Sequence, residues 1–189
     1  MPSARMWASA WKAKQMPSVN RAPNAALPRR LTIWAVLGAI VLALSSLSAF
    51  ARDHALMINI SPSLPHWAIW LDRSAQPQRG DIILFDPPPS KLLEKHFGKK
   101  PKPFGKHVMG VAGDRVTQNN RIFYVNGKPV ATAKTHSSRG EPLELGPTGI
   151  IPPGCVFVAT PHKDGFDSRY AAIGWICRPR IFGVGRPIL

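Results

Sequence analysis

Residues 121–130 read RIFYVNGKPV, and this stretch decides the fold class. Four apolar or aromatic residues run directly into Asn126-Gly127, and Lys128-Pro129-Val130 follows. Asn-Gly between apolar runs is the strongest short-range signal for a β-hairpin, because a tight type I′ turn needs two residues that tolerate positive φ. The stretch therefore predicts two antiparallel strands joined by a two-residue turn.

Short apolar runs of similar length lie on both sides of this hairpin. They are Met57–Ile60, His66–Leu71, Ile82–Phe85, Lys106–Ala112, Val156–Ala159 and Ile173–Ile176. Lys91–Phe97 is predicted to form a helical turn, and no long amphipathic helix is predicted after residue 50. Short strands at this spacing predict an all-β domain.

Residues 31–50, LTIWAVLGAIVLALSSLSAF, carry no charge and approach the ~20 residues that cross a bilayer as a helix. A core helix would normally have a polar face, and this segment has none. Residues 1–30 contain six Lys or Arg and no acidic residue, which predicts a basic cytoplasmic tail. The domain of residues 52–189 is then expected on the periplasmic side of the inner membrane. Because Ala49-Phe50-Ala51 resembles a cleavage site, a retained single-pass anchor and a removed signal peptide both stay open.

The formal net charge is +15, and the part from residue 52 onward carries +9, from 19 Lys or Arg less 10 Asp or Glu. A basic exported domain suits the lipid of an anionic membrane surface, and nucleic acid is the other partner that such a charge allows. The two cysteines, Cys155 and Cys177, can pair in an oxidising compartment or remain as two thiols. They lack metal-ligand spacing and the histidines are scattered, so neither a metal nor a cofactor is expected.

Ser61-Pro62-Ser63-Leu64-Pro65 presents two hydroxyls on a backbone that its prolines keep out of a helix. On its own, this is ordinary loop sequence. A catalytic triad of Ser63, His107 and Asp167 is one possibility, and Lys106 as the base is another. In a strand Lys106 and His107 point to opposite faces, so only one of them can face a site. A lysine base must be neutral, and burial among apolar groups lowers its pKa.

Three blocks of the chain, over roughly residues 57–177, resemble the type I signal peptidase family in their order. Ser63-Leu64-Pro65 is similar to the serine block of the TraF branch, the conjugative-transfer peptidases. Lys106–Asp114 is similar to Lys-Arg-Val-x-Gly-x-x-Gly-Asp, with histidine in place of arginine. Asp167-Ser168-Arg169, with Gly174 one residue late, is similar to Ser-x-Asp-Ser-Arg-x-x-Gly. The resemblance implies a signal-peptidase-like β domain behind one membrane helix.

The resemblance also implies a role for each matched residue. Ser63 would be the nucleophile and Lys106 the general base. Ser61 would help to bind the oxyanion. Asp167 and Arg169 would support the site, with Asp167 able to orient Lys106 or balance its charge.

Two segments depart from the family pattern. Gly165 stands where the family usually has a serine that hydrogen-bonds the lysine, so Ser168 or Asp167 is expected to hold Lys106 instead. Residues 66–70 replace the usual Pro-x-Gly-x-Tyr/Trp pattern after the serine, which affects the substrate groove rather than the chemistry.

The function that these expectations imply is a membrane-bound serine endopeptidase that processes an exported preprotein. A conjugative pilin precursor is the expected substrate, with a linear or cyclic product, and components of conjugation or type IV secretion are possible partners. A general signal peptidase is the first alternative, although the short chain disfavours it. A non-catalytic basic envelope or nucleic-acid-binding protein on the same fold is the second, and nucleic acid is the less expected partner.

Overall fold

The computed structural model describes residues 28–58 and 64–188. Residues 1–27, 59–63 and 189 lie outside the described part of the chain. The end of the strand predicted at Met57–Ile60, and both serines Ser61 and Ser63, therefore fall among residues that the structure does not describe.

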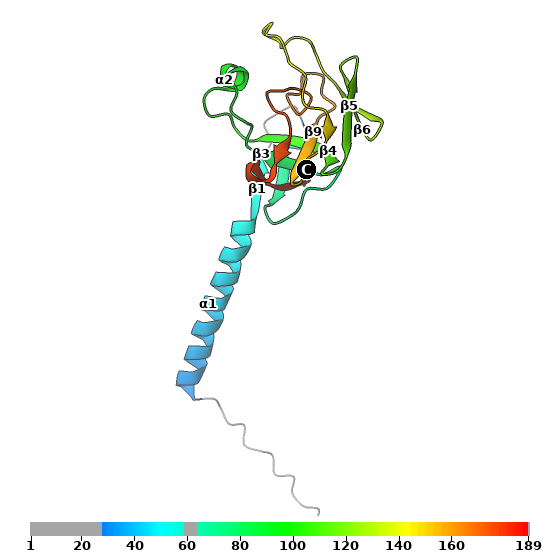
Figure 1. Cartoon of the computed structure of the whole chain (residues 1–189). Coiled ribbons are helices and arrows are strands. Elements are labelled where there is room, and N and C mark those ends of the chain that lie inside the picture. The colour runs from blue at the N-terminus through cyan, green and yellow to red at the C-terminus, as the bar shows by residue number, and fades with distance from the viewer. Residues whose placement is uncertain (1–27, 59–63, 189) are drawn as a thin grey trace, which may run out of the picture. The chain divides into compact units, whose positions relative to one another are not determined.

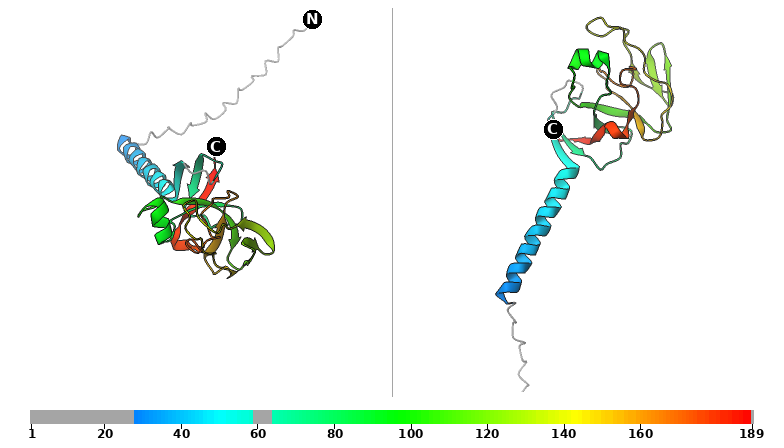
Figure 2. Two further views of the ribbon diagram at one scale, coloured as in Figure 1. Left: turned by 90° about the horizontal axis from the view of Figure 1, so that it is seen from above. Right: turned by 60° about the vertical axis from the view of Figure 1, so that its left-hand side comes forward.

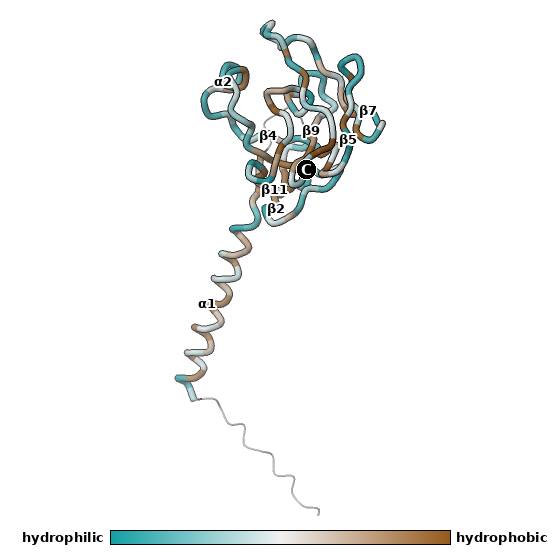
Figure 3. The backbone as a smooth tube through the Cα atoms, viewed as in Figure 1, coloured by the Kyte–Doolittle hydropathy of each residue, from teal (hydrophilic) through white to brown (hydrophobic). Residues whose placement is uncertain are grey.

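Helix α1 (Arg29–Asp53) contains the uncharged segment and extends beyond it at both ends. At ~1.5 Å per residue, its 25 residues span ~37 Å, which exceeds the ~30 Å hydrocarbon core of a bilayer. Its residues are mostly apolar except at the two ends of the helix (Figure 3), and none of them is buried in the described part of the chain. The helix is long and apolar enough to cross a membrane.

The chain after α1 forms a seven-stranded sheet and a four-stranded sheet (Figure 1). The large sheet has the order β1-β2-β11-β3-β4-β9-β10, and all its neighbouring strands are antiparallel. Its strands are β1 (His54–Ile58), β2 (Ala68–Asp72), β3 (Ile82–Phe85), β4 (Phe104–Val111), β9 (Cys155–Ala159), β10 (Ile176–Cys177) and β11 (Ile181–Pro187). The all-β prediction for this domain is confirmed.

The small sheet contains the hairpin predicted from Asn126-Gly127. Its order is β7-β6-β5-β8, with bounds β5 (Arg115–Asn119), β6 (Ile122–Val125), β7 (Lys128–Thr132) and β8 (Gly149–Ile150). Asn126 and Gly127 have φ of 49° and 80°, as a type I′ turn requires. The β5–β6 turn also has two positive φ values, at Asn120 and Arg121, although it contains no glycine.

The core lies on both faces of the large sheet, because every residue of β3 and of β9 is buried. Alternation sends Ile83 and Phe85 into one apolar cluster, together with Val108 and Val158. Leu84 enters a second cluster on the other face. Continuous apolar strands of this kind are typical of a sheet that is covered on both sides.

Two short helical elements interrupt the strands. Helix α2 (Lys91–Phe97) begins at the N-cap Ser90, whose hydroxyl accepts from Leu92 N–H, and it lies outside the two sheets (Figure 2). This confirms the helical turn predicted there. The other element is the 3₁₀ turn η1 (Arg178–Arg180).

The chain between β9 and β10 returns to the large sheet, where β10 pairs with β9. Cys155 on β9 and Cys177 on β10 are cross-strand partners and form a disulfide. The strand predicted at Ile173–Ile176 is largely wrong, because Tyr170 C=O accepts from the N–H groups of both Ile173 and Gly174 in a turn. Gly174 has a φ of 60°. Only Ile176, the last residue of the predicted strand, pairs with β9.

Candidate active site

Strand β4 carries Lys106 into the middle of the large sheet. Lys106 lies opposite Ile83 of β3 and is only 4% exposed, whereas its neighbour His107 is partly exposed. The expectation that these two side chains point to opposite faces is therefore confirmed. Lys106 shares its face with Val108, and the Phe104 ring centroid lies 5.9 Å from Lys106 Nζ.

The buried environment of Lys106 lowers its pKa from the ordinary 10.5 to about 8. Burial is the largest cause, because an ammonium loses its hydration among apolar side chains. The positive charge of Arg169 lowers the pKa further, and the negative charge of Asp167 opposes both effects. An appreciable fraction of the amine is therefore neutral at slightly alkaline pH.

Asp167 and Arg169 form a buried ion pair beside β9. Their exposed fractions are 0% and 2%. Arg169 Nε and Nη2 donate to the two Asp167 oxygens at 2.7 and 2.8 Å. Arg169 also donates to the carbonyls of Thr160 and Thr132, so its guanidinium joins the end of β9 to the small sheet. Burial raises the pKa of Asp167, while the hydrogen bonds and charge of Arg169 act against that rise.

Residues 167–169 run alongside the end of β9 and pair with its backbone. Ser168 N–H donates to Val158 C=O, and Ser168 Oγ accepts from Val158 N–H at 3.0 Å. Asp167 Oδ2 accepts from Thr160 N–H at 3.1 Å. Within the described residues, the Asp167 carboxylate accepts hydrogen bonds from Thr160 and Arg169 and not from His107, so the Asp–His contact of the possible triad is not formed there.

Ser61 and Ser63 lie outside the described residues, but Leu64 follows them directly. Leu64 is buried at 5% exposure. A Cβ on Gly105 would lie 2.9 Å from Leu64 Cδ1, so Leu64 packs closely against the residue that precedes Lys106. The chain next to the predicted nucleophile thus contacts the strand that carries the predicted base.

Asp114, the last residue of the block that begins at Lys106, accepts hydrogen bonds from three other residues. It accepts from Val111 N–H at 2.7 Å, from Asn126 Nδ2 at 2.8 Å and from Arg79 Nη2 at 2.7 Å. Burial alone would raise its pKa, but these donors together hold the pKa below its ordinary value. Asp114 therefore fixes the turn that ends β4, and it ties that turn to the hairpin of the small sheet.

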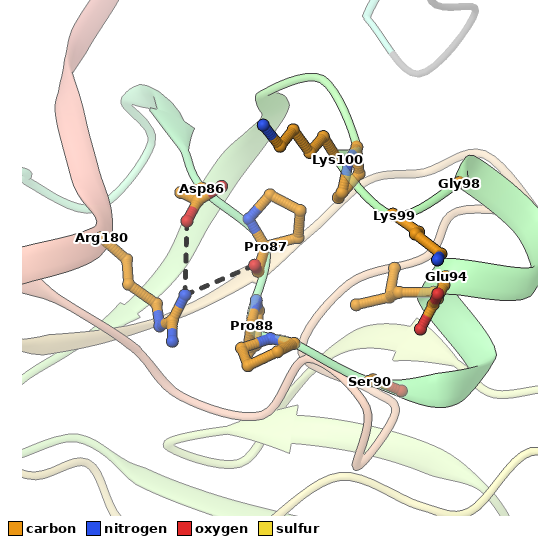
Figure 4. Close-up of a pocket in the computed structure, with 12 residues that line it drawn as sticks. Asp86, Pro87, Pro88, Ser90, Glu94, Gly98, Lys99, Lys100 and Arg180 are labelled. Carbon is orange, nitrogen blue, oxygen red and sulfur yellow. Dashed lines mark hydrogen bonds and ion pairs between the residues drawn. The ribbon is translucent and has the colours of Figure 1, made fainter.

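A pocket of about 610 Å³ lies between α2, the proline run at residues 87–89 and η1 (Figure 4). Arg180 points toward Asp86 and Pro87 C=O within it, at 3.5 and 3.4 Å. None of its lining residues belongs to the predicted site. Among the described ranges, no group of three or more His, Cys, Asp or Glu is arranged to hold a metal ion.

Comparison with known proteins gives consistent matches. Residues 29–189 match the family model for signal peptidase, peptidase S26. The chain is 27% identical over 165 residues to the conjugal transfer protein TraF of Agrobacterium fabrum, covering 80% of this chain and 92% of that protein. It is 32% identical over 105 residues to signal peptidase I of Bacillus caldolyticus, covering 49% and 52% of the two chains.

A solved signal peptidase I from Enterococcus faecalis is 26% identical, with a TM-score of 0.38 over 58% of this chain and 97% of that one. The family model spans most of the chain, including α1 and every strand of both sheets. The matched relatives include both TraF and signal peptidase I. This chain therefore belongs to the S26 signal peptidase family, in its TraF-like branch.

Proposed function

We propose that the protein is a membrane-anchored endopeptidase in which Ser63 is the nucleophile and Lys106 the general base. The observation that carries this proposal is the burial of Lys106, which brings its pKa to about 8. A base whose pKa lies near the working pH combines a useful neutral fraction with a useful affinity for the proton. The contact of Leu64 with Gly105 supports an arrangement in which the Ser63 segment lies beside the strand that carries this amine.

The reaction is an acyl transfer. Neutral Lys106 Nζ takes the proton of Ser63 Oγ as this oxygen bonds to the peptide carbonyl carbon. The resulting oxyanion accepts hydrogen bonds from Ser63 N–H and the Ser61 hydroxyl. The C–N bond then breaks, the Lys106 ammonium protonates the leaving amine, and an ester remains on Ser63. Water releases the acyl group as an acid, or an amine of the same product releases it as a ring.

Asp167 and Arg169 support the base without touching the substrate in this proposal. Their ion pair holds residues 167–169 against β9, so that one negative and one positive charge face the lysine from fixed positions. The two charges have opposite effects on the pKa of Lys106, and burial dominates both. Removal of either charge is therefore expected to move the pH dependence of the reaction.

The substrate that we propose is an exported protein with an extended cleavage segment, and specifically a conjugative pilin precursor. Support for the conjugative assignment is the similarity to a protein named for conjugal transfer. Strand β1 is an edge of the large sheet, and Ser61 and Ser63 follow it in the sequence. An extended peptide can add to such an edge through its backbone. The small residues expected beside the scissile bond rest on the family resemblance.

We also propose that α1 anchors the enzyme in the inner membrane with the β domain in the periplasm. The Cys155–Cys177 disulfide supports this side, because disulfides persist in oxidising compartments. A general signal peptidase remains the second candidate, and the 32% identity to a signal peptidase I favours it. Processing of several unrelated preproteins at similar rates would decide for that candidate.

The test compares membranes that contain the unaltered chain, Ser63→Ala, Lys106→Ala or the exposed-site control Lys128→Ala. The substrates are a co-expressed conjugative pilin precursor and an internally quenched peptide with alanine at the first and third positions before the scissile bond. Both active-site variants should stop cleavage, and the control should not. Cleavage by the unaltered enzyme should rise with pH through about 8. Normal cleavage by either active-site variant would refute the proposal.

A further inference from the structure

Thr160 carries a buried hydroxyl that the proposed mechanism has not used. The residue is 1% exposed, and its Oγ1 has no hydrogen-bond partner among the described residues. Its backbone is fully engaged, since its N–H donates to Asp167 and its C=O accepts from Arg169. A buried hydroxyl without a partner costs free energy and is rare in folded proteins, so it requires an explanation.

The strand register places Thr160 beside Lys106. His107 pairs with Ala159 and Val108 pairs with Val158 across the antiparallel β4–β9 ladder. The same register, continued by one residue, brings Thr160 opposite Lys106. Opposite residues of an antiparallel pair point to the same face with their Cβ atoms about 5 Å apart. The unused hydroxyl therefore lies on the face of the sheet that holds the lysine.

Gly165 shows how the space around that hydroxyl is filled. A Cβ on Gly165 would lie 2.4 Å from Thr160 Oγ1 and 3.0 Å from Asp167 Oδ2. The φ of Gly165 is outside the left-handed region, so the backbone itself would accept another residue. The Thr160 hydroxyl thus occupies the place into which a side chain at position 165 would project.

The two other groups considered for holding the lysine are already engaged. Ser168 Oγ accepts from Val158 N–H. Both oxygens of Asp167 accept from Arg169, and one of them also accepts from Thr160 N–H. Hydrogen bonds of a catalytic group often form only when the substrate is bound, so the open acceptor at Thr160 is available for that state.

We propose that Thr160 is the positioning residue of Lys106, and that its hydroxyl accepts a hydrogen bond from Lys106 Nζ in the working enzyme. This inference rests on the proposed Ser63–Lys106 function. A neutral amine has two N–H groups and one lone pair, so fixing one N–H limits the directions in which the lone pair can point. Thr160 thereby directs the lone pair toward the nucleophile and supplies the hydroxyl that position 165 lacks.

The first test replaces the hydroxyl without changing the shape of the side chain. Thr160→Val keeps the volume and β-branching, whereas Thr160→Ser keeps the hydroxyl. With the purified full-length chain in detergent and the quenched peptide as probe, Thr160→Val should lower kcat ~10–100-fold, the range expected when a reacting group is misplaced. KM should stay within about threefold, because the hydroxyl is proposed to act on the chemical step rather than on binding. Thr160→Ser should keep kcat within about threefold of the unaltered enzyme on the same reasoning.

The pH profile separates positioning from a structural role. The hydroxyl also accepts from the charged ammonium, so its loss disfavours the charged form. Asp167 and Arg169 remain in place, and the midpoint of the rise in kcat should therefore move below that of the unaltered enzyme. Equal kcat and midpoint in Thr160→Val and the unaltered enzyme would overturn the inference, and so would a Thr160→Ser enzyme as slow as Thr160→Val.

A second test moves the hydroxyl to position 165. Gly165→Ser alone should lower activity, because its Cβ would meet Thr160 Oγ1 at 2.4 Å. Thr160→Ala removes that obstacle, so the double variant Thr160→Ala/Gly165→Ser should be more active than either single variant. A double variant no better than Thr160→Ala would count against the inference. Ser63→Ala in the same assay separates the two failures, because cleavage that survives it refutes the proposed function itself.

Discussion

The burial of Lys106 predicts that this lysine lowers the stability of the folded protein at neutral pH. Lys106→Met keeps a flexible chain of similar length and removes the titrating amine. Because a tenfold change in proton affinity corresponds to about 1.36 kcal/mol, lowering the pKa from 10.5 to about 8 costs about 3 kcal/mol. Lys106→Met should therefore gain stability relative to the unaltered chain wherever the lysine is charged.

The sign of the pH dependence follows from the two pKa values. Below about pH 8 the amine is charged in both the folded and the unfolded state, so the cost is present in full. Between about 8 and 10.5 the folded state has released the proton and the unfolded state still holds it, so stability rises with pH. Most of the advantage of Lys106→Met over the unaltered chain, about 2.5 kcal/mol, should therefore disappear between pH 7 and pH 10.

The measurement is urea unfolding of the oxidised full-length chain in mild detergent, followed by tryptophan fluorescence at several pH values. Contacts that methionine fails to reproduce shift the stability difference equally at every pH, so the slope of that difference is the test. Lys128→Met, at an exposed strand position, is the control and should change stability by less than about 0.5 kcal/mol throughout. A difference between Lys106→Met and the unaltered chain that stays constant from pH 7 to pH 10 would show that Lys106 is not held as described.

Three further predictions concern stability and use the same unfolding assay. Arg169→Met should lower the free energy of unfolding by about 3–5 kcal/mol, because it leaves the Asp167 carboxylate buried without its partner. Adding Asp167→Asn should recover part of that loss. Equal stability of Arg169→Met and the unaltered chain would contradict this prediction. Replacing Cys155 and Cys177 by serine should lower the free energy of unfolding by about 3 kcal/mol, because the disulfide closes a loop between cysteines 22 positions apart. An unchanged unfolding midpoint would contradict this prediction. Gly127→Ala should cost about 1 kcal/mol, since its φ of 80° suits glycine, whereas no loss would argue against the type I′ turn.

The sequence predicts local features of this fold well because their causes are local. Asn126-Gly127 signals its own turn, and the alternation of Lys106 and His107 needs only the pleat of one strand. The β5–β6 turn was not predicted, because Asn120 and Arg121 adopt positive φ without a glycine to indicate it. There the pairing of β5 with β6 imposes the backbone conformation that the local sequence does not favour.

The parts of the site that depend on register could not be predicted in the same way. The sequence resemblance pointed to Lys106, Asp167 and Arg169, but Thr160 belongs to none of its three blocks. Its inferred position opposite Lys106 comes from continuing by one residue the register of two strands that are far apart in the chain. The strand predicted at Ile173–Ile176 failed for a related reason, since apolar residues in a buried turn give the same pattern as a short strand.

The place of β11 in the large sheet has a consequence for the order in which the sheet can be completed. Strand β11 follows all the other described strands along the chain, yet it lies between β2, which follows the Ser63 segment, and β3, which pairs with the strand of Lys106. Strands β1 and β2 therefore lack a hydrogen-bonded neighbour in the rest of the sheet until residues 181–187 are in place. For the enzyme that we propose, the order of synthesis alone would then delay the joining of the Ser63 segment to the strand of Lys106 until β11 has been made.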